Sequence, residues 1–114
     1  MAGEAFQQSR TVPHTVVNSP SAVKVSTPQY RVASRGGSTL VSIFAGEKPT
    51  GGYEVEVSRV EGEGSACTVH YSVLQPEADA IVPQVLTYPS QTIRIPSICK
   101  EIKVDPVLPR GPVR

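Results

Sequence analysis

The sequence predicts an all-β protein, a single-domain antiparallel β-sandwich, and three observations lead to this class. The chain has 114 residues, which is the size of one ordinary domain. Hydrophobic residues make up 39% of it, and eleven prolines and nine glycines interrupt it, a composition unlike that of a disordered chain or a helical bundle. Several short runs alternate apolar and polar residues, whereas no segment sustains the 3.6-residue period of an amphipathic helix. A small closed β-barrel is the alternative architecture for the same strands.

The first third of the chain carries the weaker strand signals. Residues 1–21 show no sustained period, so we interpret them as a loosely ordered lead-in, part of which can pair as an edge strand through the valines at 16 and 17. Residues 22–26 (AVKVS) alternate apolar and polar side chains. Tyr30 and Val32 repeat this pattern, which gives a second short strand.

The middle of the chain carries the stronger signals. Residues 38–45 (STLVSIFA) are apolar on both alternating sides, as in a strand covered on both faces. In the strand predicted over residues 53–60, Tyr53, Val55 and Val57 share one face, and Glu54, Glu56 and Ser58 share the other, which predicts solvent on that side. Residues 61–64 (EGEG) supply glycine for a tight hairpin turn, and residues 66–74 return with every second side chain, from Cys67 onward, pointing inward.

The last third is predicted as loops, short strands and an extended end. Residues 75–84 form a crossing loop with at most one helical turn. Residues 85–97 contain two short strand-like runs, and residues 101–104 add one more alternation. The predicted organisation is a lead-in at 1–21, a β-domain at 22–104 and an extended proline-rich tail at 105–114.

Charge and hydropathy argue against several classes of partner. The formal net charge is +1, from eleven basic and ten acidic residues spread along the chain, so we expect neither nucleic acid nor anionic lipid as a partner. No apolar stretch approaches the roughly 20 residues of a membrane helix, so no membrane span is predicted. The N-terminus lacks the apolar core of a signal peptide, so we expect none in this chain.

Cys67 and Cys99 are the only thiols in the sequence. They permit a single disulfide, which an oxidising compartment would favour, and two small buried hydrophobic residues are the alternative that the sequence leaves open. No pair of ligands shows a short zinc-type spacing, and no glycine-rich phosphate motif occurs. We therefore predict neither a metal site nor a cofactor.

Catalytic chemistry is not indicated by the sequence. Cys67 and His70 lie three apart on a predicted strand, which places them on opposite faces. Cys99 could meet His14 or His70 only through a tertiary contact, and the paired glutamates have the pattern of a solvated strand face. The prediction is therefore that the protein is not an enzyme.

The loop KPTGGY, residues 48–53, is the most distinctive motif. Pro49 presets a turn, and Gly51 is expected to take the left-handed position that follows it. Gly52 is not needed for the turn, and its missing side chain would let another backbone, internal or from a partner, come close. The structural alternative is that Gly52 relieves a β-bulge where the next strand begins, with Tyr53 covering the core. The functional interpretation is a stiff exposed loop tip that docks on a partner.

Two segments together resemble a known family. FAGEKPTGGYEVEV and, about thirty residues later, VPQVLTYPSQTIRIP are similar to the PrcB C-terminal domain family of protease-complex proteins, over residues 39–96. The resemblance implies a non-catalytic bacterial domain, exported or held in the cell envelope, that associates with a surface protease complex. The chain departs from it in having no lipoprotein cysteine near its start, and residues 1–38 align with nothing in the family. The family-like positions are Gly46, Pro49, Thr50, Gly51, Gly52, Tyr53, Thr87, Tyr88 and Pro89.

A fainter resemblance links the loop to another family. KPTGGY is similar to the N-P-T-T-G-Y loop of the chagasin-like cysteine-protease inhibitors, which are immunoglobulin-like sandwiches that insert loops into a papain-type cleft. Residues 62–64 imitate the glycine-rich loop of that family only loosely, and the chain has no tryptophan for its aromatic loop. This resemblance implies a direct protease inhibitor.

The sequence thus leads to a ranked set of functions. The first is a protein-binding domain that acts as an accessory or scaffold component of an exported or cell-envelope protease complex. A direct protease inhibitor is the alternative, and a hydrolase with an unrecognised tertiary site ranks third. The predicted partner is a protein, and the resemblance implies a protease. The predicted partner-binding residues are Lys48, Pro49, Thr50, Gly51, Gly52, Tyr53, Thr87, Tyr88 and Pro89.

Overall fold

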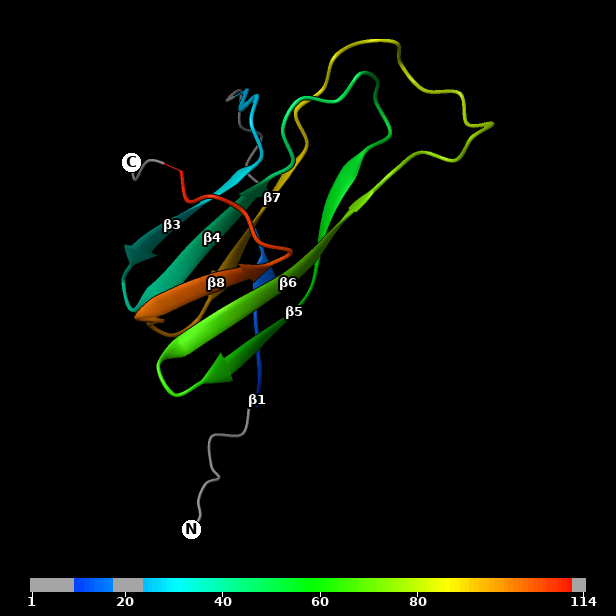
Figure 1. Cartoon of the computed structure of the whole chain (residues 1–114). Helices are drawn as coiled ribbons and strands as arrows, with labels where there is room; N and C mark the ends of the chain where they lie inside the picture. The colour runs from blue at the N-terminus through cyan, green and yellow to red at the C-terminus, as the bar shows by residue number, and fades with distance from the viewer. Residues whose placement is uncertain (1–9, 18–23, 112–114) are drawn as a thin grey trace.

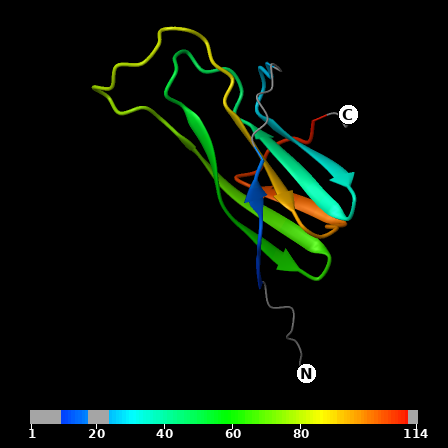
Figure 2. The ribbon, with the colours of Figure 1, turned by 180° about the vertical axis from the view of Figure 1, so that it is seen from behind.

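Two four-stranded sheets pack face to face in the computed structural model, which describes residues 10–17 and 24–111 (Figures 1 and 2). Sheet A has the strand order β1 (Arg10–Val12), β5 (Glu54–Glu63), β6 (Ala66–Leu74) and β8 (Glu101–Asp105). Sheet B has the order β2 (Thr15–Val16), β7 (Ser90–Ile95), β4 (Ser38–Phe44) and β3 (Gln29–Arg35). The described residues contain no helix. The predicted all-β sandwich is confirmed, and the barrel alternative is wrong because each sheet ends in its own edge strands.

Alternating side chains build the interior from both sheets. In the central strand β4, Thr39, Val41 and Ile43 are fully buried, whereas the residues between them are half-buried, so its second face is only partly covered. The fully buried side chains of the whole core are Thr39, Val41, Ile43, Val60, Val69, Ile93 and Ile95. These β-branched residues suit strands because their stiff side chains pack closely on a pleated surface.

Strands β5 and β6 form the long hairpin that the sequence predicted. The chain reverses at Gly64, whose φ of 63° is the left-handed conformation that glycine adopts readily. A bulge at Ser58 shifts the register between Val57 and Arg59. The extra residue lets both Val57 and Val60 point inward although they are three apart.

Four predicted elements differ from the structure. The first of the two strand-like runs in residues 85–97 is not a strand, because residues 85–89 form only the isolated bridge of Thr87 with Lys48 before β7 begins at Ser90. Strand β8 runs parallel to β6, so sheet A is mixed and not purely antiparallel. Residues 24–26 belong to no strand, although Val25 is buried, and the rest of the predicted 22–26 strand lies outside the described residues. The 75–84 loop contains no helical turn; it holds a reverse turn in which the amide of Ala80 donates to the carbonyl of Glu77 at 2.9 Å.

Both ends of the described chain pair with the sheets. The predicted edge pairing near residue 16 is confirmed, because β2 pairs with β7 and the Val17 amide donates to the Thr92 carbonyl at 2.8 Å. Residues 109–111 of the proline-rich tail lie beside β3. There the Tyr30 amide donates to the Pro109 carbonyl at 3.1 Å, and the Gly111 amide donates to the Tyr30 carbonyl at 2.7 Å.

A disulfide links the hairpin to the crossing between the sheets. Cys67 on β6 and Cys99, in the connection from β7 to β8, are bonded with their Cα atoms 5.8 Å apart, so the alternative of two free buried thiols is wrong. Thr39 supports the same connection from the core. Its hydroxyl donates to the Ser97 carbonyl at 2.8 Å and accepts from the Cys99 amide at 3.0 Å, so this buried polar side chain is fully satisfied.

Removing the disulfide tests how much of the fold depends on it. The bond closes a loop with a sequence separation of 32, for which chain entropy predicts a stabilisation of about 3–4 kcal/mol. We expect the double variant Cys67→Ala, Cys99→Ala to lose about this free energy of unfolding in urea titrations. The wild-type protein with a reducing agent should match the variant, and equal unfolding midpoints with and without the reductant would contradict the assignment.

Candidate partner-binding site

Two long loops leave the same end of the sandwich and lie side by side (Figures 1 and 2). One comprises residues 45–53, between β4 and β5, and the other comprises residues 75–89, between β6 and β7. Lys48 and Thr87 pair like residues of two antiparallel strands, with amide-to-carbonyl distances of 2.8 and 3.0 Å. We call the two loops together the arm. Their backbone pairing joins segments about forty residues apart in the chain, so the arm is braced at its base.

The paired glycines lie at the contact between the two loops. Gly51 is buried, its amide donates to the Pro83 carbonyl at 2.9 Å, and a Cβ placed on it would lie 2.9 Å from Pro83 Cδ. Gly52 has a φ of 89°, and a Cβ there would lie 2.8 Å from Pro76 and 2.9 Å from Val82. Gly52, and not Gly51 as predicted, therefore takes the left-handed position. The chain's own second loop is the neighbour that comes close to both glycines.

The predicted bulge at the start of the following strand is also wrong in position. Strand β5 begins regularly at Glu54, and its register shift lies further along, at Ser58. Gly52 is thus required by its backbone angle and by the approach of Pro76 and Val82. The local sequence alone could not show this, because the packing atoms come from a loop more than twenty residues away.

Side-chain hydrogen bonds reinforce the base of the arm. The Thr87 hydroxyl donates to the Thr50 carbonyl at 2.7 Å, and the Tyr88 hydroxyl donates to a carboxylate oxygen of Glu47 at 3.2 Å. Partial burial, with the Glu47 carboxylate beside the phenol, raises the pKa of Tyr88. Each of these bonds joins one loop to the other, so the Thr-Tyr-Pro segment and the KPTGGY loop form one structural unit.

The remaining predicted residues lie on the same loop. The Lys48 ammonium is 5.7 Å from the centre of the Tyr53 ring, a cation–π distance, and both side chains are half-buried. Pro49 is exposed. The structure therefore brings all nine predicted residues together, and most of them hold the arm in shape through contacts within the chain.

Exposed apolar side chains on the longer loop were missed by the sequence reasoning. Ile81 is fully exposed, and Val85 and Leu86 are 57% and 56% exposed. Leu74, where β6 enters the loop, is 40% exposed. Isolated surface hydrophobic residues are common, but three of these lie within six residues of one braced loop, and we call Ile81, Val85 and Leu86 the apolar ridge. A signal was present in the apolar letters of AIVPQVL, which fit neither a strand nor a helix.

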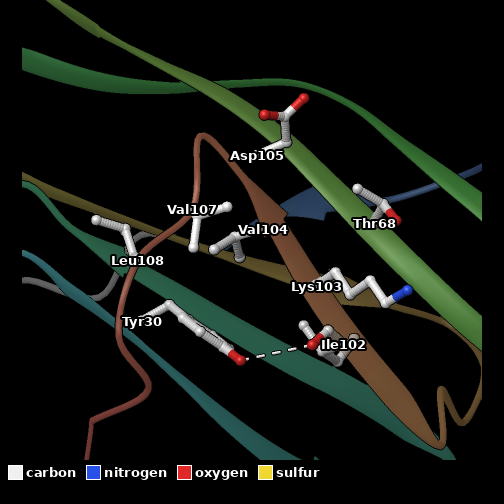
Figure 3. A pocket seen from close by; sticks show the side chains of 8 residues that line it. All are labelled: Tyr30, Thr68, Ile102, Lys103, Val104, Asp105, Val107 and Leu108. Carbon is white, nitrogen blue, oxygen red and sulfur yellow. Dashed lines mark hydrogen bonds between the residues drawn. The ribbon is translucent and has the colours of Figure 1, made fainter.

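A shallow cavity of about 410 Å³ lies between β8, β3 and the tail (Figure 3). Val104, Val107 and Leu108 gather over the ring of Tyr30, whose hydroxyl points to the Ile102 carbonyl at 3.5 Å. The cavity marks the open edge of the sandwich, where the tail only partly closes the gap. The apolar part of its lining consists of Ile102, Val104, Val107 and Leu108, and its polar groups come from Tyr30, Thr68, Lys103 and Asp105.

His70 points outward, as the alternation in residues 66–74 predicts, and lies in an ion-pair cluster on the outer face of sheet A. Its side chain is 17% exposed, with Nε2 2.8 Å from a Glu61 carboxylate oxygen and Nδ1 3.3 Å from one of Asp105. Arg59 lies 3.3 Å from the other oxygen of Glu61. The hydrogen bond from His70 is the largest of the effects that hold the pKa of Glu61 below its usual value. The cluster bridges strands β5, β6 and β8 and is structural in character.

The described residues offer neither a metal-binding cluster nor a membrane-spanning helix. Within residues 10–17 and 24–111, no three side chains of His, Cys, Asp or Glu lie together so as to hold a metal ion. The same part of the chain contains no helix of the length and hydropathy needed to cross a membrane.

The fold and the arm define a disulfide-linked β-sandwich domain that presents a braced pair of loops. Residues 39–96, just over half of the chain, match the family described as PrcB C-terminal, and the chain belongs to this family. This confirms the family suggested by the KPTGGY and Thr-Tyr-Pro segments. No curated protein and no solved structure matches the chain.

Alanine substitutions can separate the two reasons for glycine at position 52, namely its positive φ and the close approach of Pro76 and Val82. Gly52→Ala should destabilise the protein by more than about 2 kcal/mol, since it combines a strained backbone angle with contacts below 3 Å. The matched control is Gly64→Ala, where φ is also positive but no atom lies within 4 Å, so only about 1–2 kcal/mol is expected. Thermal and urea unfolding measure both. Equal losses in the two variants would show that Pro76 and Val82 do not press on Gly52.

The ion-pair cluster predicts a pH dependence with a definite sign. Because the pKa of Glu61 is depressed below its ordinary 4.5, its contribution to stability is present above about pH 4.5 and is lost as the pH falls through the lowered value. Glu61→Gln should therefore unfold more easily than the wild type at pH 6, and the two should converge in strong acid. Glu56→Gln, at an exposed position of the same strand, is the control. A gap between wild type and Glu61→Gln that stays constant down to strong acid would contradict this account.

Proposed function

We propose that this domain is a non-catalytic protein-binding module and serves as an accessory component of an exported or cell-envelope protease complex. The observation that carries the proposal is the apolar ridge of Ile81, Val85 and Leu86, held in solvent on a braced arm. The family supports the association with a protease complex. The proposal adds that the arm is the surface that meets the partner.

The energetics of the ridge favour a docking role. Burying a large aliphatic side chain against a partner gains about 1.5–3 kcal/mol, so three such side chains can supply several kcal/mol towards binding. Ordering a flexible loop would consume much of this gain. The Lys48–Thr87 pairing and the Gly51–Pro83 hydrogen bond already order the arm, which keeps that cost small.

The nine residues predicted from the sequence divide into two roles in this proposal. Buried or bonded groups such as Gly51 and Thr87 set the shape of the arm. Exposed Pro49, together with the accessible parts of Lys48 and Tyr53, lies on the loop beside the ridge and extends the contact surface. A partner would thus touch both loops.

The disulfide supports an extracytoplasmic location. Structural disulfides persist in oxidising environments such as the cell envelope and the exterior, and reducing systems remove them in the cytosol. The Cys67–Cys99 bond is largely shielded from solvent, since both residues are buried. An exported domain is the setting in which this bond forms and lasts.

The two alternatives fare differently against the structure. A hydrolase that uses Cys99 as nucleophile loses its thiolate to the disulfide, so that mechanism is discarded. A direct inhibitor that inserts the arm into a protease cleft remains the second candidate, because the arm projects well beyond the sheets (Figure 1). The two binding roles differ in whether the protease stays active when bound.

Substitutions on the ridge test the proposal. Ile81→Ser combined with Leu86→Ser should weaken binding to an envelope protease by at least tenfold and leave the melting temperature unchanged, because both side chains make few internal contacts. Val107→Ser is the control, since Val107 is 87% exposed but lies away from the arm. The measurement is cross-linking and co-purification from the cell envelope, with mass spectrometry to identify the captured protein.

Protease assays separate the remaining roles. An accessory component should bind while the captured protease, papain and subtilisin keep their full activity towards a small peptide substrate. Inhibition that Ile81→Ser, Leu86→Ser abolishes would favour the inhibitor. Capture of no protease by the wild type, or equal capture by the ridge variant, would overturn the proposed function.

A further inference from the structure

Charge is segregated between the two sheets although it is spread evenly along the sequence. The strands of sheet B contain three arginines, Arg31, Arg35 and Arg94, and no aspartate or glutamate. The strands of sheet A carry six carboxylates, those of Glu54, Glu56, Glu61, Glu63, Glu101 and Asp105, against three basic residues. The even spread of charge along the sequence therefore does not carry over to the outer faces of the two sheets.

Strand register places the three arginines on the outer face of sheet B. Arg31 pairs with Ser42 and Arg35 with Ser38, on the side of β4 opposite its buried residues. Arg94 pairs with Leu40, which in turn pairs with Ala33, midway between the two arginines of β3. All three side chains therefore point away from the core, and Arg35 and Arg94 are exposed.

The arginines form a triangle with an apolar and hydroxyl floor. Residues four apart on a strand are about 13–14 Å apart, and strands separated by one neighbour are about 10 Å apart, so each side of the triangle spans roughly 12–14 Å. Leu40 and Ala33 occupy its centre. Beside them the hydroxyls of Ser42 and Thr92 are hydrogen-bonded to each other at 2.8 Å, so these two polar side chains already have partners. We call this surface the arginine triangle.

The guanidinium groups have no acidic partner within the described part of the chain. The ion pairs found there involve Arg59 and His70, both on sheet A. Arg31 is held in place without being neutralised: its Nε donates to Gln29 Oε1 at 3.3 Å, and its guanidinium lies 5.0 Å from the centre of the Phe44 ring. A positioned and unneutralised arginine is well suited to bind a carboxylate in bidentate fashion.

We propose that the arginine triangle is a binding surface for a short, extended acidic segment of a partner protein. In such a segment, alternate side chains face the sheet, so carboxylates four residues apart would reach Arg31 and Arg35, about 13 Å apart, with an apolar side chain over Ala33 and beside Leu40. The surface lies on the sandwich and not on the arm, so the inference stands independently of the proposed function. The arginine triangle thus gives the domain a second partner-binding surface, which selects its partner by charge.

The size of the surface favours a peptide over a second copy of the chain. Four strands of at most seven residues present roughly 350 Å² of sheet face, well below the roughly 800 Å² per partner of a standard stable interface. The acidic face of sheet A could in principle meet the triangle of another copy. However, Glu61 and Asp105 are already engaged by Arg59 and His70, which reduces that attraction.

A synthetic peptide tests the proposal directly. The probe is fluorescein-labelled Glu-Ser-Leu-Ser-Glu with blocked ends, and the control peptide carries glutamine in place of both glutamates. Titrations followed by fluorescence anisotropy, with NMR mapping, should show at least tenfold tighter binding of the acidic peptide at low salt, weakening as salt rises. The amide signals of Ala33, Leu40 and Ser42 should shift.

Protein variants complete the test. The triple variant Arg31→Gln, Arg35→Gln, Arg94→Gln should lose at least tenfold in affinity, whereas Arg59→Gln on the opposite sheet should stay within about twofold. Circular dichroism and melting temperature confirm that the variants fold. Equal affinity for both peptides, an unaffected triple variant, no binding at millimolar peptide, or shifts confined to the arm would overturn the proposal. So would tighter binding of a short single-stranded DNA, or salt-sensitive self-association that the triple variant abolishes.

Discussion

Burial of β-branched side chains between the two sheets is the interaction on which the rest of the structure depends. Ile43, Ile93 and Ile95 of sheet B face Val60 and Val69 of sheet A, and none of these five is accessible to solvent. Each contributes about 1.5–3 kcal/mol on burial, and their stiffness leaves little freedom for the strands to shift. Because the strands are fixed in this way, the loops that leave them at one end can be long and still hold a defined shape.

The strands were predictable from the sequence wherever one face meets the core. Period-two alternation located β4, β5, β6, β7 and β8, since register errors would expose the whole buried set of a strand. It did not place Val60 inward, because the bulge at Ser58 breaks the alternation of β5. It failed at residues 24–26, where Val25 is buried without strand pairing. Alternation also carries no information on the partner of a strand. The parallel pairing of β8 with β6 was therefore outside its reach.

The candidate site was predictable as a set of segments but not as a surface. The structure places the KPTGGY and Thr-Tyr-Pro motifs side by side, and their role in binding stays a prediction. The reason for Gly52 lies in Pro76 and Val82, which only folding brings near. The ridge at Ile81 and Leu86 escaped detection because exposure is a property of three-dimensional packing. The arginine triangle was hidden for a related reason: strands distant in sequence share one face, and the net charge averages over both sheets.

The N-terminal segment changes sheets within a few residues, and this has a practical consequence. Strand β1 closes the edge of sheet A against β5, and β2, just after Pro13, closes the edge of sheet B against β7. One short ribbon thus shields the backbone of two edges that would otherwise be open to pairing with another chain. A shortened protein that began after residue 17 would keep nearly all of its core residues. It would, however, expose the backbone edges of β5 and β7, which could then pair with strands of other molecules. Tags and fusion junctions are therefore best placed so that this segment remains paired with β5 and β7.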